Sequence, residues 1–215
     1  MIEKVQSSII KCPDCGCEIN AQRYNIMNCA EDPSLKEKIV NRSLFAYTCP
    51  KCGKKIIFNF DFTLCDPEKK YVIQRVTTMN MEVYKEILVG SEAIRKAGYK
   101  IRVVPNINTA VEKIITFDAG ISDVLVELVK WNLMASAKKQ EREIEAMYFD
   151  YYDSTKDELV YFYISKKGNG TVHASYSKAK ERFVKFPDDI GSLIVDIGHI
   201  NEYAKMMKEK NIEIK

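Results

Sequence analysis

The chain has 215 residues, of which 46% are hydrophobic and 10% aromatic, and a formal net charge of +3. This length and composition allow one globular core plus a small metal-stabilised module, and they exclude a disordered chain. No apolar run approaches the roughly 20 residues of a membrane-spanning helix, and residues 1–10 lack the apolar segment of a signal peptide. We therefore expect a cytoplasmic protein that does not associate with membranes.

The motif Cys-Pro-x-Cys-Gly occurs twice, at residues 12–16 and 49–53. A tetrahedral Zn²⁺ takes four thiolates at about 2.3 Å, and each CxxC turn can supply two of them. The glycine that ends each motif relieves backbone crowding around the sulfurs. The spacing predicts one structural zinc site whose ligands are Cys12, Cys15, Cys49 and Cys52. Four thiolates and one Zn²⁺ contribute about −2 in formal charge, which would bring the holo protein close to neutral.

Two other interpretations of the cysteines stay open. CxxC is also the spacing of dithiol redox pairs, and a zinc site that expels its ion on oxidation would make the protein a thiol-based sensor. Three of the seven cysteines lie outside the motifs. Cys17 is either an alternative ligand or an unliganded neighbour, and we expect Cys29 and Cys65 to be ordinary buried thiols.

Residues 1–78 combine turns with strand-like runs and are predicted to form a zinc-ribbon-like module. Residues 34–40 follow an Asp-Pro pair typical of a helix start, so a helix is expected between the two motifs. Phe58, Phe60 and Phe62 alternate with polar residues, which favours a strand with one buried face. The predicted strands are residues 8–11, 45–48, 56–62 and 71–76.

Residues 79–140 change to a helical period and are predicted to form a helical segment that completes the first region. A helix is expected over residues 81–96 with Gly98 as its stop, followed by a strand at 100–104. Thr109 and Glu112 have capping-box spacing and predict the start of a second helix. Ser122 is the expected cap of a third, which extends to about Gln140 and is apolar except for a narrow polar strip through residues 123, 127 and 130.

Residues 141–215 are predicted to form a β-rich portion with a terminal helix. The expected strands are residues 144–152, 159–165 and 171–175, with a hairpin at Gly168-Asn169-Gly170. Residues 177–186 form a helix or a strand, and residues 199–210 an amphipathic helix. Its inward-facing side chains are expected to be Ile200, Tyr203, Ala204 and Met207.

The order of these segments resembles the CpXC family over residues 8–130. The resemblance rests on the two cysteine motifs, the insert at 32–36, the Phe-rich segment after the second motif, and the stretches 102–104, 112–114 and 120–123. It implies a bacterial or archaeal protein and supports the four motif cysteines as the functional unit. It supplies no reaction.

We therefore expect an α+β protein with an N-terminal zinc-ribbon-like module, a helical insert, further helices and a C-terminal portion rich in β-hairpins. The closed ligand set and the apolar helix at 122–140 favour a protein-interaction or assembly module, and a nucleic-acid-binding zinc ribbon is the alternative. The aromatic residues within 148–163 would suit stacking on bases, but no basic residues are interleaved with them, which favours a sheet core. His173 and His199 lack metal-ligand spacing, and no familiar phosphate-binding or nucleophile motif favours an enzyme.

Overall fold

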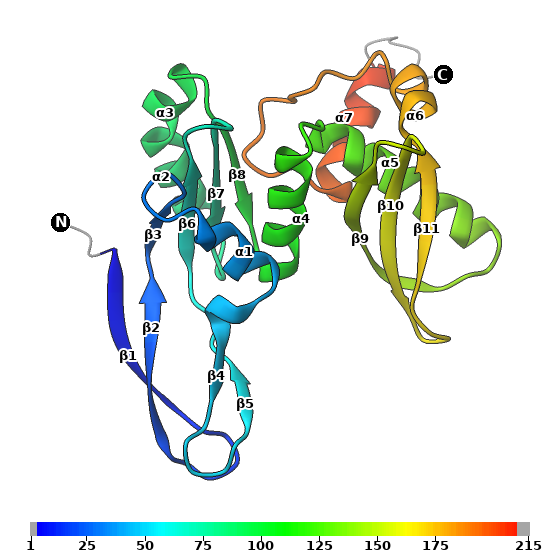
Figure 1. Ribbon diagram of the computed structural model, residues 1–215. Coiled ribbons are helices and arrows are strands. Elements are labelled where there is room, and N and C mark those ends of the chain that lie inside the picture. Colours follow the sequence, from blue (N-terminus) through cyan, green and yellow to red (C-terminus); the bar gives the residue numbers. More distant parts are fainter. Residues whose placement is uncertain (1–3, 210–215) are drawn as a thin grey trace. The chain divides into compact units, whose positions relative to one another are not determined.

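The computed structural model describes residues 4–209 and divides into two compact units, Met1–Val111 and Glu112–Lys215 (Figure 1). Helices and several small sheets occur together, so the predicted α+β class is confirmed. The three-part division expected from the sequence, at residues 78 and 140, stays a prediction.

The first unit begins with two antiparallel hairpins. Strand β1 (Val5–Lys11) pairs with β2 (Glu18–Tyr24), and β4 (Ala46–Thr48) pairs with β5 (Lys55–Ile57). Each hairpin turn carries one Cys-Pro-x-Cys-Gly motif, because the pairs that close the turns flank residues 12–17 and 49–54. We call these two hairpins the ribbon. Strand β2 was not predicted.

A four-stranded sheet follows the ribbon. Its order is β3 (Ile26–Asn28), β6 (Phe62–Asp66), β7 (Tyr71–Arg75) and β8 (Lys100–Val104). The central β6–β7 pair is antiparallel and the two outer pairs are parallel. The sequence predicted β7 and β8, but it missed β3.

The strand predicted at residues 56–62 is wrong. Strand β5 ends at Ile57 and β6 begins at Phe62, so residues 58–61 connect two different sheets. This connection bonds elsewhere: the backbone Phe58 N donates to Phe45 O at 2.8 Å, and the side-chain Oδ1 of Asp61 accepts from Thr77 N at 2.8 Å. Phe60 and Phe62 are nevertheless buried, so the alternation of burial persists without strand pairing.

The helices of the first unit match the prediction in part. Helix α1 (Ser34–Val40) has the predicted bounds, and a short 3-10 turn η1 (Ser43–Phe45) follows it. The predicted helix 81–96 is two helices, α2 (Met81–Gly90) and α3 (Glu92–Lys96). They are separated at Ser91, whose hydroxyl donates back to Leu88 O at 2.9 Å and thereby competes with continuous helical bonding.

The second unit packs helices against a three-stranded antiparallel sheet. The helices are α4 (Ile107–Asp118, which begins in the first unit), α5 (Asp123–Lys139), α6 (Tyr176–Arg182) and α7 (Ile197–Glu209). The sheet order is β11 (Gly170–Ser175), β10 (Glu158–Ser165) and β9 (Ile144–Asp153), which confirms the predicted hairpins. Ile200 is fully buried in this core. The Ala204 and Met207 side chains and Lys210 lie outside the described residues.

Two predictions about α4 and α5 are corrected. Asn106, not Thr109, caps α4: its side-chain oxygen accepts from Thr109 N at 2.9 Å. The polar strip of α5 is buried and pairs with α4: Lys113 contacts Asp123 (3.2 Å) and Glu127 (3.3 Å), and Lys130 contacts Glu112. Lys130 also contacts Glu127 (3.1 Å) within α5. We call these five residues the buried ion network.

The aromatic residues of β9 and β10 contribute to the core. Phe149 and Tyr161 are buried with ring centroids 5.5 Å apart, and the Tyr161 hydroxyl donates to Val126 O at 3.1 Å. His173 and His199 each pair with one acidic neighbour, Glu158 at 2.8 Å and Asp196 at 2.9 Å. These contacts favour structural roles for both sets of residues.

Candidate metal centre

The two cysteine turns have the same backbone geometry. In the first, Cys12 N donates to Cys17 O and Gly16 N donates to Cys12 O, both at 2.9 Å; in the second, Cys49 N donates to Lys54 O and Gly53 N to Cys49 O, also at 2.9 Å. Both glycines have positive φ, 68° and 74°. An L side chain is strained there, which explains why glycine follows each second cysteine.

The two turns bring four sulfurs together. The Sγ atoms of Cys12, Cys15, Cys49 and Cys52 all lie within 4.8 Å of one another. Two of the pairs, Cys12–Cys52 and Cys15–Cys49, are 3.6 Å apart. Four sulfurs placed tetrahedrally at 2.3 Å from one ion would be separated by about 3.8 Å. The cluster is therefore compatible with a metal ion, and its donor set fits a soft or borderline cation.

Backbone N–H groups favour the ionised form of one cysteine of this cluster, Cys49. The N–H of Cys52, followed in effect by that of Lys51, lowers the pKa of the Cys49 thiol to about 6 despite burial. At Cys15 a backbone contact from Cys17 also lowers the pKa, but burial and the neighbouring thiols together outweigh it and raise the pKa to about 12. Full ionisation of the cluster therefore needs a positive charge among the sulfurs, which a bound cation supplies.

An ion pair joins the two turns beside the sulfurs. Lys54 Nζ lies 3.1 Å from Asp14 Oδ2, with both side chains about half exposed. The hydrogen bond to Asp14 raises the pKa of Lys54. This contact was not predicted, although Asp14 lies within the first motif and Lys54 directly follows the second, and the two motifs were expected to meet. Exposed pairs of this kind contribute little stability, so the contact orients the turns more than it holds them.

The remaining cysteines lie outside the cluster. Among the described residues the group that could hold a metal excludes Cys17, whose Sγ donates to Glu18 O at 3.5 Å. Cys29 is buried, as expected, whereas Cys65 is only partly buried; burial raises the pKa of the Cys65 thiol. Each of these two therefore behaves as a packing residue of the β3–β6 region.

These features define an α+β protein with a four-cysteine, metal-compatible cluster on paired hairpins. None of the helices in residues 4–209 has both the length and the apolar content required to cross a bilayer. The family model described as CpXC protein matches residues 10–130, and the chain belongs to the CpXC family. No curated protein and no solved structure matches the chain.

Proposed function

We propose that Cys12, Cys15, Cys49 and Cys52 bind one Zn²⁺ that stabilises the ribbon, and that the ribbon is a protein-interaction or assembly module. Four thiolates close a tetrahedral shell and leave no position for a substrate, as in structural zinc sites. When bound, the ion would supply folding energy by cross-linking the two turns. The backbone bonds of the two turns hold their shape, and the Asp14–Lys54 pair orients one turn against the other.

The observation that carries this proposal is the small size of the ribbon core. The hydrophobic cluster beside the cysteine turns has three buried residues, Cys12, Ile19 and Cys49, and two of these three are cluster cysteines. One isoleucine contributes only about 1.5–3 kcal/mol on burial. Two hairpins of this size are not expected to hold together on that contribution alone, which supports a bound ion that links the four thiols.

Elemental analysis of Cys49→Ser and Cys17→Ser tests the metal. Both replace one cysteine in the same module, but only Cys49 lies in the four-sulfur cluster. We expect one zinc per chain in the wild type and in Cys17→Ser, and loss of stoichiometric zinc in Cys49→Ser. One zinc per chain in Cys49→Ser, or an equal loss of zinc in both variants, would contradict the ligand assignment.

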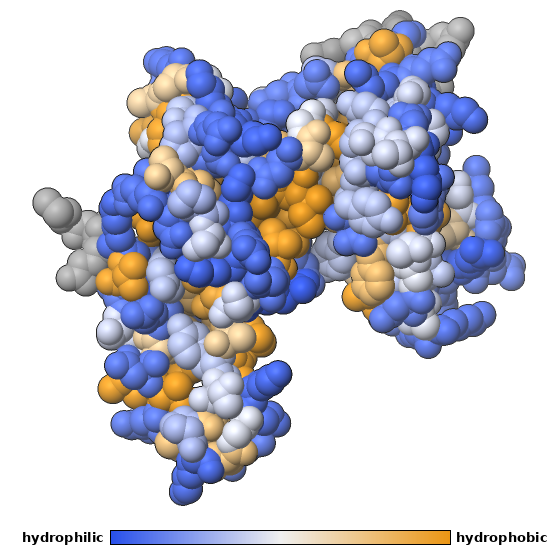
Figure 2. Space-filling model, in the orientation of Figure 1, coloured by the Kyte–Doolittle hydropathy of each residue, from blue (hydrophilic) through white to orange (hydrophobic). Residues whose placement is uncertain are grey.

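The proposed partner surface lies on the ribbon strands. The apolar helix at 122–140, which first suggested a partner, is largely buried in its own unit and offers little surface. The ribbon instead exposes Val5, Ile9 and Ile57, by 43%, 71% and 52%. Figure 2 shows hydrophobic side chains at the surface of this region. Exposed apolar side chains grouped on one small module are typical of protein contact sites.

A photo-crosslinking residue at Ile57, matched with one at Val184, tests this surface in cells. Val184 is the suitable control because it is also apolar and exposed, by 75%, but lies in the second unit. We expect one discrete protein adduct from position 57 and none at 184. Adducts with nucleic acid at position 57 would favour the alternative function, and identical products at both positions would overturn the proposed surface.

A further inference from the structure

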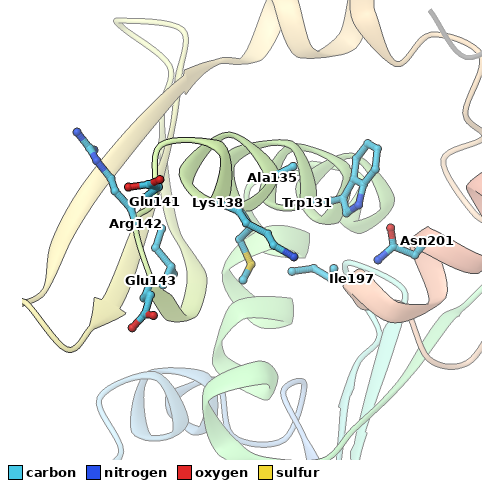
Figure 3. A pocket seen from close by; sticks show the side chains of 10 residues that line it. Trp131, Ala135, Lys138, Glu141, Arg142, Glu143, Ile197 and Asn201 are labelled. Atoms are coloured by element: carbon cyan, nitrogen blue, oxygen red, sulfur yellow. The ribbon is translucent and has the colours of Figure 1, made fainter.

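The second unit contains a cavity of about 720 Å³ that is separate from the cysteine cluster. It lies between the second half of α5, the start of β9 and the first turns of α7 (Figure 3). Its apolar lining consists of Trp131, Met134, Ala135, Ile144 and Ile197. A volume of this size and a largely apolar wall with a few polar groups are typical of small-molecule sites.

The polar groups of the cavity are available for a ligand. Among the side chains that the structure describes, which leave out those of residues 204 and 206–209, no hydrogen bond or ion pair involves the ammonium of Lys138, the indole N–H of Trp131 or the amide of Asn201. All three are donors, although the Asn201 amide can also accept. Their partner would therefore be an acceptor, and the positive charge of Lys138 favours an anionic one.

The charged residues at the other end of the cavity do not offset this preference. Figure 3 shows Lys138 extending toward Ile197, on the side of Trp131 and Asn201, whereas Arg142 and Glu143 extend away from that side. Glu143 also pairs with Lys166 at 3.7 Å. Glu141 lies with Arg142 and Glu143, at the end farther from Trp131. The Trp131 end thus presents one ammonium above an apolar wall.

We propose that this cavity binds a small amphipathic anion, a carboxylate on an aliphatic or aromatic body. Lys138 holds the carboxylate through a charge-assisted hydrogen bond. The Trp131 indole covers the apolar body, and Met134 adapts to its shape because a thioether side chain is flexible. The proposal is independent of the metal centre, since every lining residue belongs to the second unit.

Trp131 is the only tryptophan of the chain, so its fluorescence reports on this cavity alone. The full-length protein would be titrated with octanoate, 1-octanol and octylamine, which share one apolar body and differ in charge. We expect a saturable change in emission with octanoate, and weaker binding of the neutral and cationic probes. The indole N–H resonance of Trp131 should move in the same titration.

Lys138→Gln and Lys139→Gln provide the matched variants. Both lysines are exposed on the same turn of α5, but only Lys138 lines the cavity. Lys138→Gln should weaken octanoate binding about fivefold, the size of an exposed ion pair, and leave 1-octanol binding unchanged, while Lys139→Gln behaves as the wild type. No saturable change at millimolar octanoate, equal affinity for the three probes, or equal effects of the two variants would overturn the proposal.

Discussion

The ribbon and the second unit are stabilised in different ways. The hydrophobic cluster beside the cysteine turns of the ribbon contains three buried residues, two of which are cluster cysteines. The second unit has a continuous hydrophobic core that includes Val126, Leu159 and Tyr161, each at 0% exposure. With the proposed Zn²⁺ bound, two regions of one chain would depend on different forces: metal–thiolate bonds in the ribbon and burial of apolar surface in the second unit.

The second unit also buries charged Asp, Glu and Lys side chains, and no such side chain is buried in the ribbon. Its buried ion network contains three carboxylates and two ammonium groups, all with side chains at most 5% exposed. Buried charges are tolerated only when they are paired and hydrogen-bonded. Here Glu112 also accepts from the backbone N–H of Phe149 at 2.9 Å, so the network connects α4, α5 and β9.

The largest expected effect is that of metal removal. Treatment with a chelator under reducing conditions should abolish amide protection in β1, β2, β4 and β5, because structural zinc supplies on the order of 10 kcal/mol in small modules. Amides of β9 and β10 should keep their protection, since their core contains no metal ligand. Hydrogen exchange with mass spectrometry measures both regions at once. Unchanged protection of the ribbon strands would show that the ribbon does not depend on a bound metal, and the contrast with the second unit would fail.

The next effect concerns the buried ion network. Lys130→Met removes the ammonium that contacts Glu112 and Glu127, and it leaves Lys113 as the one ammonium of the buried ion network beside three carboxylates. We expect a loss of about 3–5 kcal/mol in the free energy of unfolding, the usual result of breaking a buried ion pair, measured by denaturant titration. Lys96→Met is the control, because its pair with Glu92 is exposed at the surface, and its effect should be close to zero.

Local patterns predicted the four-cysteine cluster and the bounds of helices α1 and α5. The spacing of the two Cys-Pro-x-Cys motifs identified the four sulfurs that meet, and Ser122 caps α5 as expected, accepting from Leu125 N. The helix cap and each single cysteine motif lie within a few consecutive residues, where covalent geometry limits the alternatives. The signals that predicted β8 were equally local, because Gly98 and Pro105 lie close to its two ends.

Features that depend on distant partners were missed. The alternation in residues 56–62 indicated burial correctly but not pairing, because burial alone cannot show that Phe58 bonds to Phe45. Strand β2 did carry a period-2 pattern, with Ile19 and Ala21 buried. The charged strip of α5 was interpreted as a polar face because its partners, Glu112 and Lys113, lie on another helix. The spacing of residues within one helix or strand does not show which other helix or strand it pairs with.

The pH dependence of stability sharpens the role of Glu112. Burial, followed by the charge of Glu127, raises the pKa of Glu112, although Lys130 and Lys113 oppose this. The folded state therefore holds a proton that the unfolded chain releases, so stability falls as the pH rises above the ordinary pKa of about 4.3 and levels off above the folded pKa. The slope from one proton is at most about 1.4 kcal/mol per pH unit.

Glu112→Gln should remove this pH dependence of stability, because a glutamine does not titrate. It keeps an oxygen that can accept from Phe149 N and Lys130. We expect the difference in unfolding free energy between the variant and the wild type to grow in favour of the variant as the pH rises. Urea titrations of both proteins from pH 4 to pH 8 provide the measurement. A difference that does not change with pH would show that Glu112 is ionised in the folded protein throughout this range.

The smallest expected effect is the loss of a helix cap, which can be compared at two helices. Ser122 Oγ and Asn80 Oδ1 each accept a backbone N–H at the start of their helix, from Leu125 and Val83. Replacing such a cap by alanine costs about 1 kcal/mol. The Ser122→Ala cost should appear in global unfolding, because α5 is packed in the core, whereas α2 has no buried residue and Asn80→Ala should only increase local amide exchange in its first turn. Equal effects on global stability would mean that α2 unfolds together with its unit, and that burial alone does not decide which elements of this chain are cooperative.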